Sequence, residues 1–199
     1  MNPKHPLTFI FIGRSGSGKG TQAELLISYL KNTFSNQVFY LESGEKFRDF
    51  VSSSSYTATL ASEYMNAGKL QPTFLATHIW SHLMIEQMKA DKHLVVDGNP
   101  RSLLEAQVLD TAFKFYDRVK PVIVYVNVSR EWAVDKLTKR GRGDDKTLAG
   151  INKRLDWFDR DVMSAVVFYK KSKDYNFLDI NGEQTVEEVH AEIMKKIKI

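Results

Sequence analysis

Five short apolar runs recur along the chain, and stretches with helical periodicity separate them. The runs are continuous rather than alternating, which favours strands buried on both faces of a parallel sheet. Right-handed crossovers between such strands build a doubly wound α/β fold, and the ligand site of that fold lies at the carboxyl ends of its strands. The predicted strands span residues 7–12, 37–41, 93–96, 121–127 and 175–180.

Helical periodicity predicts the elements between these strands. The predicted helices span residues 18–31, 45–52, 56–67, 73–90, 103–116, 130–139, 147–171 (in two pieces) and 186–196. Segment 43–72 holds only helices and turns, although a single helix would complete the crossover between its flanking strands. We therefore expect a small helical cap over the strand ends.

A glycine-rich stretch from Gly13 to Thr21 separates the first predicted strand from the first predicted helix, and it fits the pattern G-x-x-x-x-G-K. Such a loop wraps backbone N–H groups around nucleotide phosphates, because its glycines let the backbone close around an anion. The helix N-terminus adds free N–H groups and a partial positive charge. Lys19 supplies a mobile cation for the outer phosphates.

A second candidate motif, Asp97-Gly98-Asn99-Pro100-Arg101, follows the third predicted strand. The strand delivers the Asp97 carboxylate to the edge of the sheet where the glycine-rich loop lies, and there it can hold water ligands of Mg²⁺. Arg101 follows on a tight turn, where its guanidinium can fork onto a phosphate. Each motif alone is a common turn, but the two together favour a phosphate-binding site.

Length and composition narrow the class of protein. A chain of 199 residues with 43% hydrophobic content is expected to form one domain around one core. No apolar run approaches the roughly 20 residues that span a bilayer. The segment before the first apolar run, and that run itself, are too short for the two parts of a signal peptide. The chain has no cysteine, which excludes disulfides and thiolate zinc sites. We expect a cytoplasmic protein without membrane partners.

The net charge of +4 suits a protein that binds several phosphates. It would also suit weak contact with nucleic acid, but the chain has no long basic run with interleaved aromatic residues. We therefore expect no nucleic-acid partner. A nucleic-acid-binding protein remains the weakest alternative, and it would bind oligonucleotides with steep salt dependence.

The glycine-rich loop departs from the plain pattern, because Gly20 follows Lys19 and the hydroxyl comes one place later, at Thr21. This GKGTQ variant resembles the adenylate kinase family of nucleoside monophosphate kinases. Further stretches resemble motifs of that family in the expected order, over roughly residues 7–189. They are SGEKFR at 43–48, MNAGKL at 65–70, DGNPR at 97–101, KRGRGDD at 139–145 and KRL at 153–155.

The resemblance implies a reaction and an architecture. The reaction is phosphoryl transfer from Mg-ATP to AMP, which gives two ADP. The architecture is a three-layer P-loop NTPase fold, a five-stranded parallel sheet with helices on both faces, in a single domain and, we expect, a monomer. Its core comprises 1–42, 73–139 and 155–199, its NMP-binding segment 43–72, and its short lid 140–154. A lid this short has no place for zinc, so Mg²⁺ is the expected metal.

The resemblance also implies roles for individual residues. Those implied to bind ATP are Gly16, Ser17, Gly18, Lys19, Gly20, Thr21, Lys136 and Gln184. Those implied to lie near Mg²⁺ are Thr21 and Asp97. Those implied to bind the monophosphate are Ser43, Arg48, Lys69, Leu70, Gln71, Gly98, Asn99, Pro100, Arg101, Glu105, Arg142 and Arg154. Those implied to stabilise the phosphoryl group during its transfer are Lys19, Arg101, Arg140, Arg142 and Arg154.

Four positions depart from the family pattern. Asn99 replaces phenylalanine, Glu45 replaces aspartate, and Lys136 replaces an arginine that stacks on the ATP base. Glu105 stands where glutamine is usual, and an ionised glutamate only accepts hydrogen bonds. It would suit the donors of guanine better than the N1 acceptor of adenine, unless Gln107 or a backbone group reads the base. AMP is the expected acceptor, and GMP or UMP/CMP remains the alternative.

A catalytically silent nucleotide-binding protein is a further alternative. The residues that argue against it are Lys19, Asp97, Arg101, Arg142 and Arg154. His78 and His82 have metal-compatible spacing but lack a clear third ligand, so we expect them to serve packing or the surface. The cluster of Asp156, Asp159, Arg160 and Asp161 is interpreted as a solvated helix junction, with Arg160 as an alternative member of the lid network.

Overall fold

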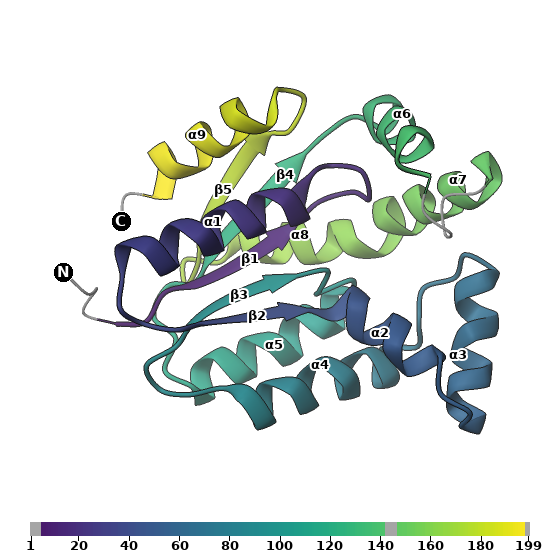
Figure 1. Cartoon of the computed structure of the whole chain (residues 1–199), viewed down its shortest axis with the longest axis horizontal. Helices are drawn as coiled ribbons and strands as arrows, with labels where there is room; N and C mark the ends of the chain where they lie inside the picture. Colours follow the sequence, from purple (N-terminus) through teal and green to yellow (C-terminus); the bar gives the residue numbers. More distant parts are fainter. Residues whose placement is uncertain (1–4, 142–146, 198–199) are drawn as a thin grey trace.

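The predicted strands form one parallel sheet in the order β2-β3-β1-β4-β5 (Figure 1). The computed structural model describes residues 5–141 and 147–197. The strands are β1 (Thr8–Ile12), β2 (Val38–Glu42), β3 (His93–Asp97), β4 (Val122–Asn127) and β5 (Asn176–Asn181). All four pairings are parallel, which confirms the predicted five-stranded sheet.

Helices cover both faces of this sheet, which explains why β1 and β3 are buried at every position. The helices are α1 (Lys19–Thr33), α2 (Ser43–Val51), α3 (Tyr56–Asn66), α4 (Thr73–Gln87), α5 (Leu103–Phe115), α6 (Arg130–Arg140), α7 (Leu148–Trp157), α8 (Met163–Lys171) and α9 (Val186–Ile197). Helices α1 and α9 cover one face around Leu26 and Ile193. Helices α4, α5 and α8 cover the other, around Trp80, Leu109 and Tyr169.

The register of the strands brings the ends of β1, β2 and β3 together. Phe11 near the end of β1 pairs with Asp97, the last residue of β3. Glu42, the last residue of β2, also pairs with Asp97. Because these strands run parallel, the loops that follow them emerge at one edge of the sheet.

Several helix boundaries differ from the sequence prediction by one to three residues; for example, α4 ends at Gln87 rather than at residue 90. Helix α2 was predicted to begin at Glu45 but begins at Ser43, because β2 passes directly into it at Glu42. The predicted helix 147–171 is two helices, as expected, and a π-helical turn (η2, Phe158–Val162) joins them. Such a turn is hard to foresee because it keeps the helical pattern of burial.

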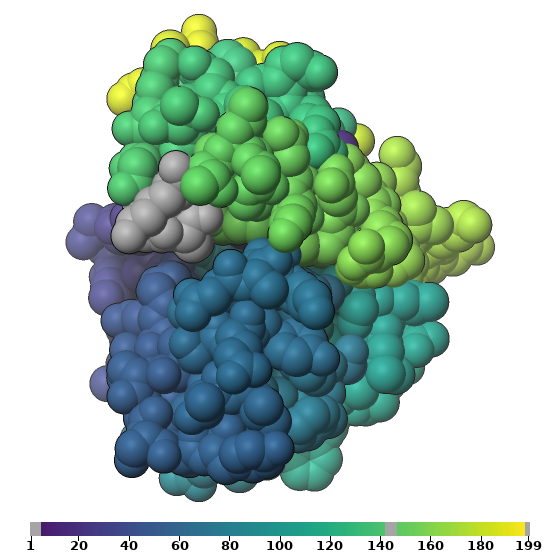
Figure 2. Space-filling view, turned by 90° about the vertical axis from the view of Figure 1, so that its right-hand side faces the viewer, coloured from purple at the N-terminus to yellow at the C-terminus, as the bar shows by residue number. Residues whose placement is uncertain are grey.

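Two smaller clusters stand on the edge of the sheet that carries the loops. Phe47, Ala61 and Leu75 join α2, α3 and α4 into one unit, and Leu137 and Ile151 join α6 to α7. Figure 2 shows the two groups meeting on one face of the molecule, the α2–α4 group in blue and α7 in green. Among the described residues, no helix is long and apolar enough to cross a membrane.

Candidate active site

The glycine-rich loop joins β1 to α1 at the loop-bearing edge of the sheet. Gly16 and Gly18 have φ values of 85° and 84°, in the left-handed region that favours glycine. A Cβ at Gly13 would lie 2.6 Å from the Val126 carbonyl oxygen, so a side chain does not fit there. Gly18 precedes α1 without a side-chain cap, which leaves the first N–H groups of that helix available to an anion.

The same absence of a cap marks the N-terminus of α2, where Glu42 makes no capping bond. By contrast, hydroxyl side chains at the N-cap position cap α3, α5, α6 and α7, through Ser55, Ser102, Ser129 and Thr147, and the Thr185 hydroxyl accepts the Glu188 N–H at the start of α9. In α1 and α2, which follow β1 and β2, no side chain at the N-cap position takes up the first backbone N–H groups, so these remain available to a ligand at this edge of the sheet.

The position of Asp97 explains the unusual Gly20. A Cβ at Gly20 would lie 3.3 Å from Asp97 Oδ2, a tight contact, so the carboxylate lies against the first turn of α1 as predicted. Asp97 is buried, and its Oδ1 has no hydrogen-bond partner among the described residues. The hydroxyl of Tyr40 lies 3.5 Å from Oδ2, and the neighbouring Thr21 is exposed.

These oxygens fit a magnesium ion that is bound chiefly by its nucleotide. Within residues 5–141 and 147–197, no group of three or more histidine, aspartate or glutamate side chains could hold a metal. Mg²⁺ keeps several waters and takes phosphate oxygens, and therefore needs only one or two protein oxygens. The buried, unpartnered Oδ1 of Asp97 suits such water-mediated binding.

Lys19 lies among the cations that the sequence assigned to the phosphates. Loss of hydration lowers the pKa of the Lys19 ammonium, although the Asp97 carboxylate raises it. The positive charges of Arg101, Arg154 and Arg140 lower the pKa further. The structure thus brings four predicted cations close enough to repel one another, and phosphate groups would relieve that repulsion.

Arg48 and Arg101 converge on the N-terminus of α2. A Cβ at Gly44 would lie 3.4 Å from Arg48 Nη1 and 3.9 Å from Arg101 Nη2. Arg101 Nε donates to the Gly98 carbonyl oxygen over 2.6 Å, and Arg48 pairs with Glu42 at 3.4 Å. Two guanidinium groups beside uncapped backbone N–H groups form a second candidate anion site, where the sequence prediction places the monophosphate.

A small, partly open pocket adjoins this anion site. Its lining residues are Ser43, Phe47, Leu70, Gln71, Ala76, Trp80, Gly98, Asn99, Arg101 and Glu105. Most residues predicted to bind the monophosphate therefore lie together. Pro100 is buried beside them, whereas Lys69 directs its ammonium over the Tyr64 ring at 5.3 Å.

Several polar atoms of this pocket have no hydrogen-bond partner among the described residues. They include Glu105 Oε2, both amide atoms of Asn99, Gln71 Oε1 and Ser43 Oγ. Glu105 is only 2% exposed, and burial raises its pKa while the positive charge of Arg101 opposes the shift. Buried polar groups are normally hydrogen-bonded, so this concentration indicates a place for a polar ligand.

Helix α7 contacts the glycine-rich loop on one side and the end of α3 on the other. Arg154 Nη2 donates to Ser15 Oγ in the glycine-rich loop over 3.0 Å. Lys153 Nζ lies 3.5 Å from the Ala67 carbonyl oxygen, at the end of the α2–α3 unit. Arg140 ends α6, and Arg142, the remaining predicted lid arginine, lies outside the described residues.

Two residues predicted near the ATP base use their side chains elsewhere. Lys136 is exposed, and its ammonium lies 4.7 Å from the centre of the Trp132 ring on the same helix. Gln184 Nε2 donates to the Asn181 carbonyl oxygen over 2.8 Å and to Glu192 Oε2 over 3.0 Å. Only the backbone near Gln184 therefore remains as the predicted contact to the base.

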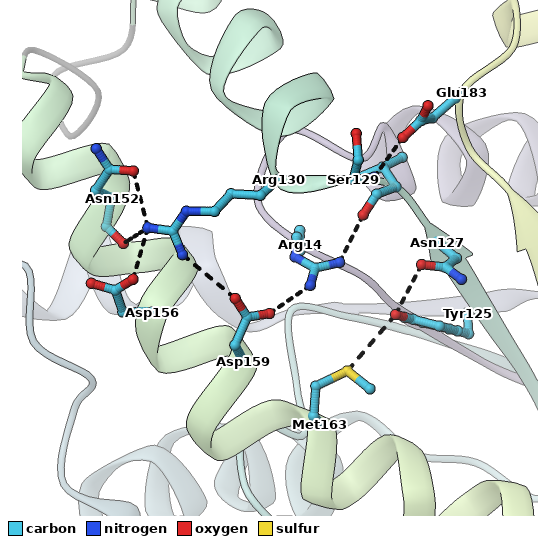
Figure 3. A network of polar contacts seen from close by, with 11 residues as sticks. Arg14, Tyr125, Asn127, Ser129, Arg130, Asn152, Asp156, Asp159, Met163 and Glu183 are labelled. Atoms are coloured by element: carbon cyan, nitrogen blue, oxygen red, sulfur yellow. Dashed lines mark hydrogen bonds and ion pairs between the residues drawn. The ribbon is translucent and has the colours of Figure 1, made fainter.

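Figure 3 shows a polar network that the sequence analysis missed. Arg14 Nη1 donates to the Val128 carbonyl oxygen over 2.7 Å, and its Nη2 pairs with Asp159 Oδ1 at 2.5 Å. Arg130 pairs with Asp156 at 2.7 Å and with Asp159 at 3.5 Å. This network ties the glycine-rich loop to η2 and to α7.

The interpretation of residues 156–161 as a solvated junction holds for the exposure of Asp159 but missed its ion pair with Arg14. Its partner Arg14 has a side chain only 18% exposed, and that guanidinium also lies over the Phe158 ring. Arg160 pairs with the adjacent Asp161 rather than with the lid. The available signal was Arg14 itself, a long cation in a loop otherwise built of small residues.

Removal of this pairing should destabilise the protein. We expect Asp159→Ala to lower the free energy of unfolding by about 1–2 kcal/mol, since it leaves a largely buried guanidinium without its carboxylate. Chemical denaturation checks this value. Asp161→Ala is the matched control, because its partner Arg160 is 70% exposed and such pairs contribute about 0–1 kcal/mol. Equal losses in the two variants would show that the network adds no particular stability.

Known proteins resemble this chain over almost its full length. A family model described as Adenylate kinase matches residues 11–174. A protein named Adenylate kinase from Nautilia profundicola is 31% identical over 192 residues, which cover 96% of this chain and 95% of that protein. Another with that name, from Corynebacterium urealyticum, is 28% identical over 183 residues, 92% of this chain and 94% of its own. A third, from Azobacteroides pseudotrichonymphae, is 29% identical over 188 residues, 93% and 94% of the two chains.

Proposed function

The chain belongs to the adenylate kinase family and is a phosphotransferase, and from this premise we propose that it transfers the γ-phosphoryl group of Mg-ATP to AMP, giving two ADP. The observation that carries the proposal is the pair of anion sites at the uncapped N-termini of α1 and α2. Arg101 and Arg154 act electrostatically on Lys19 at the first site, and Arg101 also reaches the second.

The donor occupies the glycine-rich loop in this proposal. Backbone N–H groups from Gly16 to Thr21 bind the ATP phosphates, and Lys19 neutralises their outer oxygens. Mg²⁺, when bound, neutralises phosphate charge near Thr21 and Asp97. The contact of Lys136 with Trp132 leaves ATP without an arginine stacked on its base, so we expect relaxed selectivity for the donor base.

The acceptor phosphate lies between Arg48 and Arg101, and its base enters the adjoining pocket. Phosphoryl transfer needs positioning and neutralisation of spread charge, with little covalent chemistry, so no general base is assigned. Arg154 and Arg140 supply further positive charge near Lys19. We propose that segment 43–72 covers the monophosphate and segment 140–154 covers ATP, and that together they exclude water. The contacts of α7 with Ser15 and Ala67 support such a closure.

A second candidate acceptor is GMP, because Glu105 replaces the usual glutamine in the wall of the base pocket. Nothing in the described pocket favours UMP or CMP in the same way. Monomeric state and cytoplasmic location stay predictions.

The test measures ADP formation from Mg-ATP with AMP, GMP, CMP and UMP in parallel, with and without excess EDTA. We expect turnover with AMP and its loss with EDTA, since the transferred phosphoryl group needs its metal. Preference for another acceptor would keep the reaction type and change the substrate. Tight ATP binding without product from any acceptor would instead support the silent binding protein.

A further inference from the structure

Glu105 is the most deeply buried carboxyl group of the acceptor pocket. It lies in the first turn of α5, where its backbone N–H bonds to the capping hydroxyl of Ser102 over 3.2 Å. Its side chain lines the pocket together with Trp80 and Asn99. Among the described residues, Oε2 of Glu105 has no hydrogen-bond partner, so this oxygen is available to a base that enters the pocket.

The two protonation states of this carboxyl group offer different hydrogen bonds. A neutral carboxyl group has one O–H donor and one free acceptor, whereas a carboxylate has acceptors only. The Watson–Crick edge of adenine presents a donor, its exocyclic amine, and an acceptor, N1. The corresponding edge of guanine presents two adjacent donors, at N1 and at the exocyclic amine.

We propose that Glu105 selects the acceptor base according to its own protonation: the neutral form accepts AMP and the ionised form accepts GMP. This inference rests on the proposed function, because it concerns the acceptor of that reaction. A neutral glutamic acid matches the donor and acceptor of the glutamine that adenylate kinases usually carry, and so binds adenine. The ionised form matches the two donors of guanine instead.

The groups around Glu105 act on its pKa in opposite directions. Burial raises the pKa of Glu105 and so favours the neutral acid. Three influences lower this pKa and favour the carboxylate: the positive charge of Arg101, from the turn after β3, a hydrogen bond from the Arg101 backbone, and a hydrogen bond from the Trp80 side chain. Helix α4 faces it with the Trp80 indole and α2 with the Phe47 ring, and the Tyr169 hydroxyl of α8 lies behind it.

The substrate itself shifts the balance. A bound monophosphate brings negative charge close to the Arg101 guanidinium. This charge offsets the attraction between that guanidinium and the Glu105 carboxylate. Phosphate binding therefore favours the neutral acid, and hence adenine. The phosphate is identical in AMP and GMP, so a ratio of the two nucleotides isolates the base.

The closing experiment measures kcat/KM for AMP and for GMP with Mg-ATP, from about pH 5 to about pH 8. We expect the AMP/GMP ratio to fall by up to about tenfold per pH unit, because one proton separates the two selecting forms. This slope does not depend on the value of the pKa, and the titration of the phosphate cancels. Glu105→Gln should abolish the slope and favour AMP throughout.

Glu86→Gln is the matched control, since Glu86 is exposed on α4, and it should keep the slope. A ratio that does not change with pH in the unmodified protein would overturn the inference, as would a slope that survives Glu105→Gln.

Calorimetry separates this inference from the proposed reaction. Titrations of AMP and of GMP in buffers of different ionisation enthalpy give the protons taken up on binding. We expect the AMP complex to hold about one proton more than the GMP complex, and Glu105→Gln to remove that difference. Absence of turnover with every acceptor would reject the proposed function, and equal proton uptake for AMP and GMP would reject the role of Glu105.

Discussion

Lys19→Ala is expected to lower kcat by about 10³-fold, because the lost cation neutralises charge that is concentrated on the phosphates during transfer. The loop glycines and the N-terminus of α1 remain, so ATP binding should weaken much less than turnover falls. Bound phosphates would relieve the repulsion from Arg101, Arg154 and Arg140, which lowers the pKa of Lys19. Steady-state kinetics and equilibrium ATP binding check the two parts of this prediction.

Lys31→Ala is the matched control for that experiment. Lys31 lies in the last turn of the same helix and is exposed, so its loss should leave kcat nearly unchanged. If Lys19→Ala and Lys31→Ala turned over at similar rates, the glycine-rich loop would not be the donor site.

The sheet could be predicted from the sequence because its strands are buried on both faces. Phe9, Ile10 and Val95 lie in continuous apolar runs, and each is fully buried, so periodicity alone separated strands from helices. The two buried polar residues of β3 did not disturb that pattern, because they stand at its ends: His93 accepts the Leu7 N–H, and Asp97 enters the site.

Sequence order also predicted which loops meet, since parallel strands end at a common edge. The prediction therefore holds for Asp97 beside the glycine-rich loop at Gly20, a position that depends on the backbone. It was less informative for Lys69 and Lys136. These are long, flexible side chains, and nearby aromatic rings direct their ammonium groups.

The network of Arg14 and Asp159 could not be predicted for a different reason. Its two members lie 145 positions apart, and they meet only because η2 turns Asp159 toward the glycine-rich loop (Figure 3). No local pattern encodes such a contact. The sequence marked Asp159 as one charge among several at a helix junction, and only tertiary structure separates it from Asp161.

Arg101→Ala is expected to lower kcat/KM for the monophosphate by about 10²- to 10³-fold, because a guanidinium that both binds and stabilises the phosphate is removed. Since Arg101 acts on Lys19 as well as on the α2 site, kcat should fall together with the rise in KM. Loss of monophosphate binding alone would raise KM and leave kcat unchanged. Initial-rate kinetics over a range of both substrates measures the two constants.

The conservative variant sharpens this prediction. Arg101→Lys keeps the charge but loses the planar fork that bonds the Gly98 carbonyl oxygen through Nε, so it should recover only a small part of the activity. Arg160→Ala is the matched control, since that arginine is exposed and pairs with its neighbour Asp161. Full activity in Arg101→Lys would mean that charge alone matters at this position. Full activity in Arg101→Ala would show that the monophosphate does not bind at the N-terminus of α2. Its base would then not enter the Glu105 pocket either.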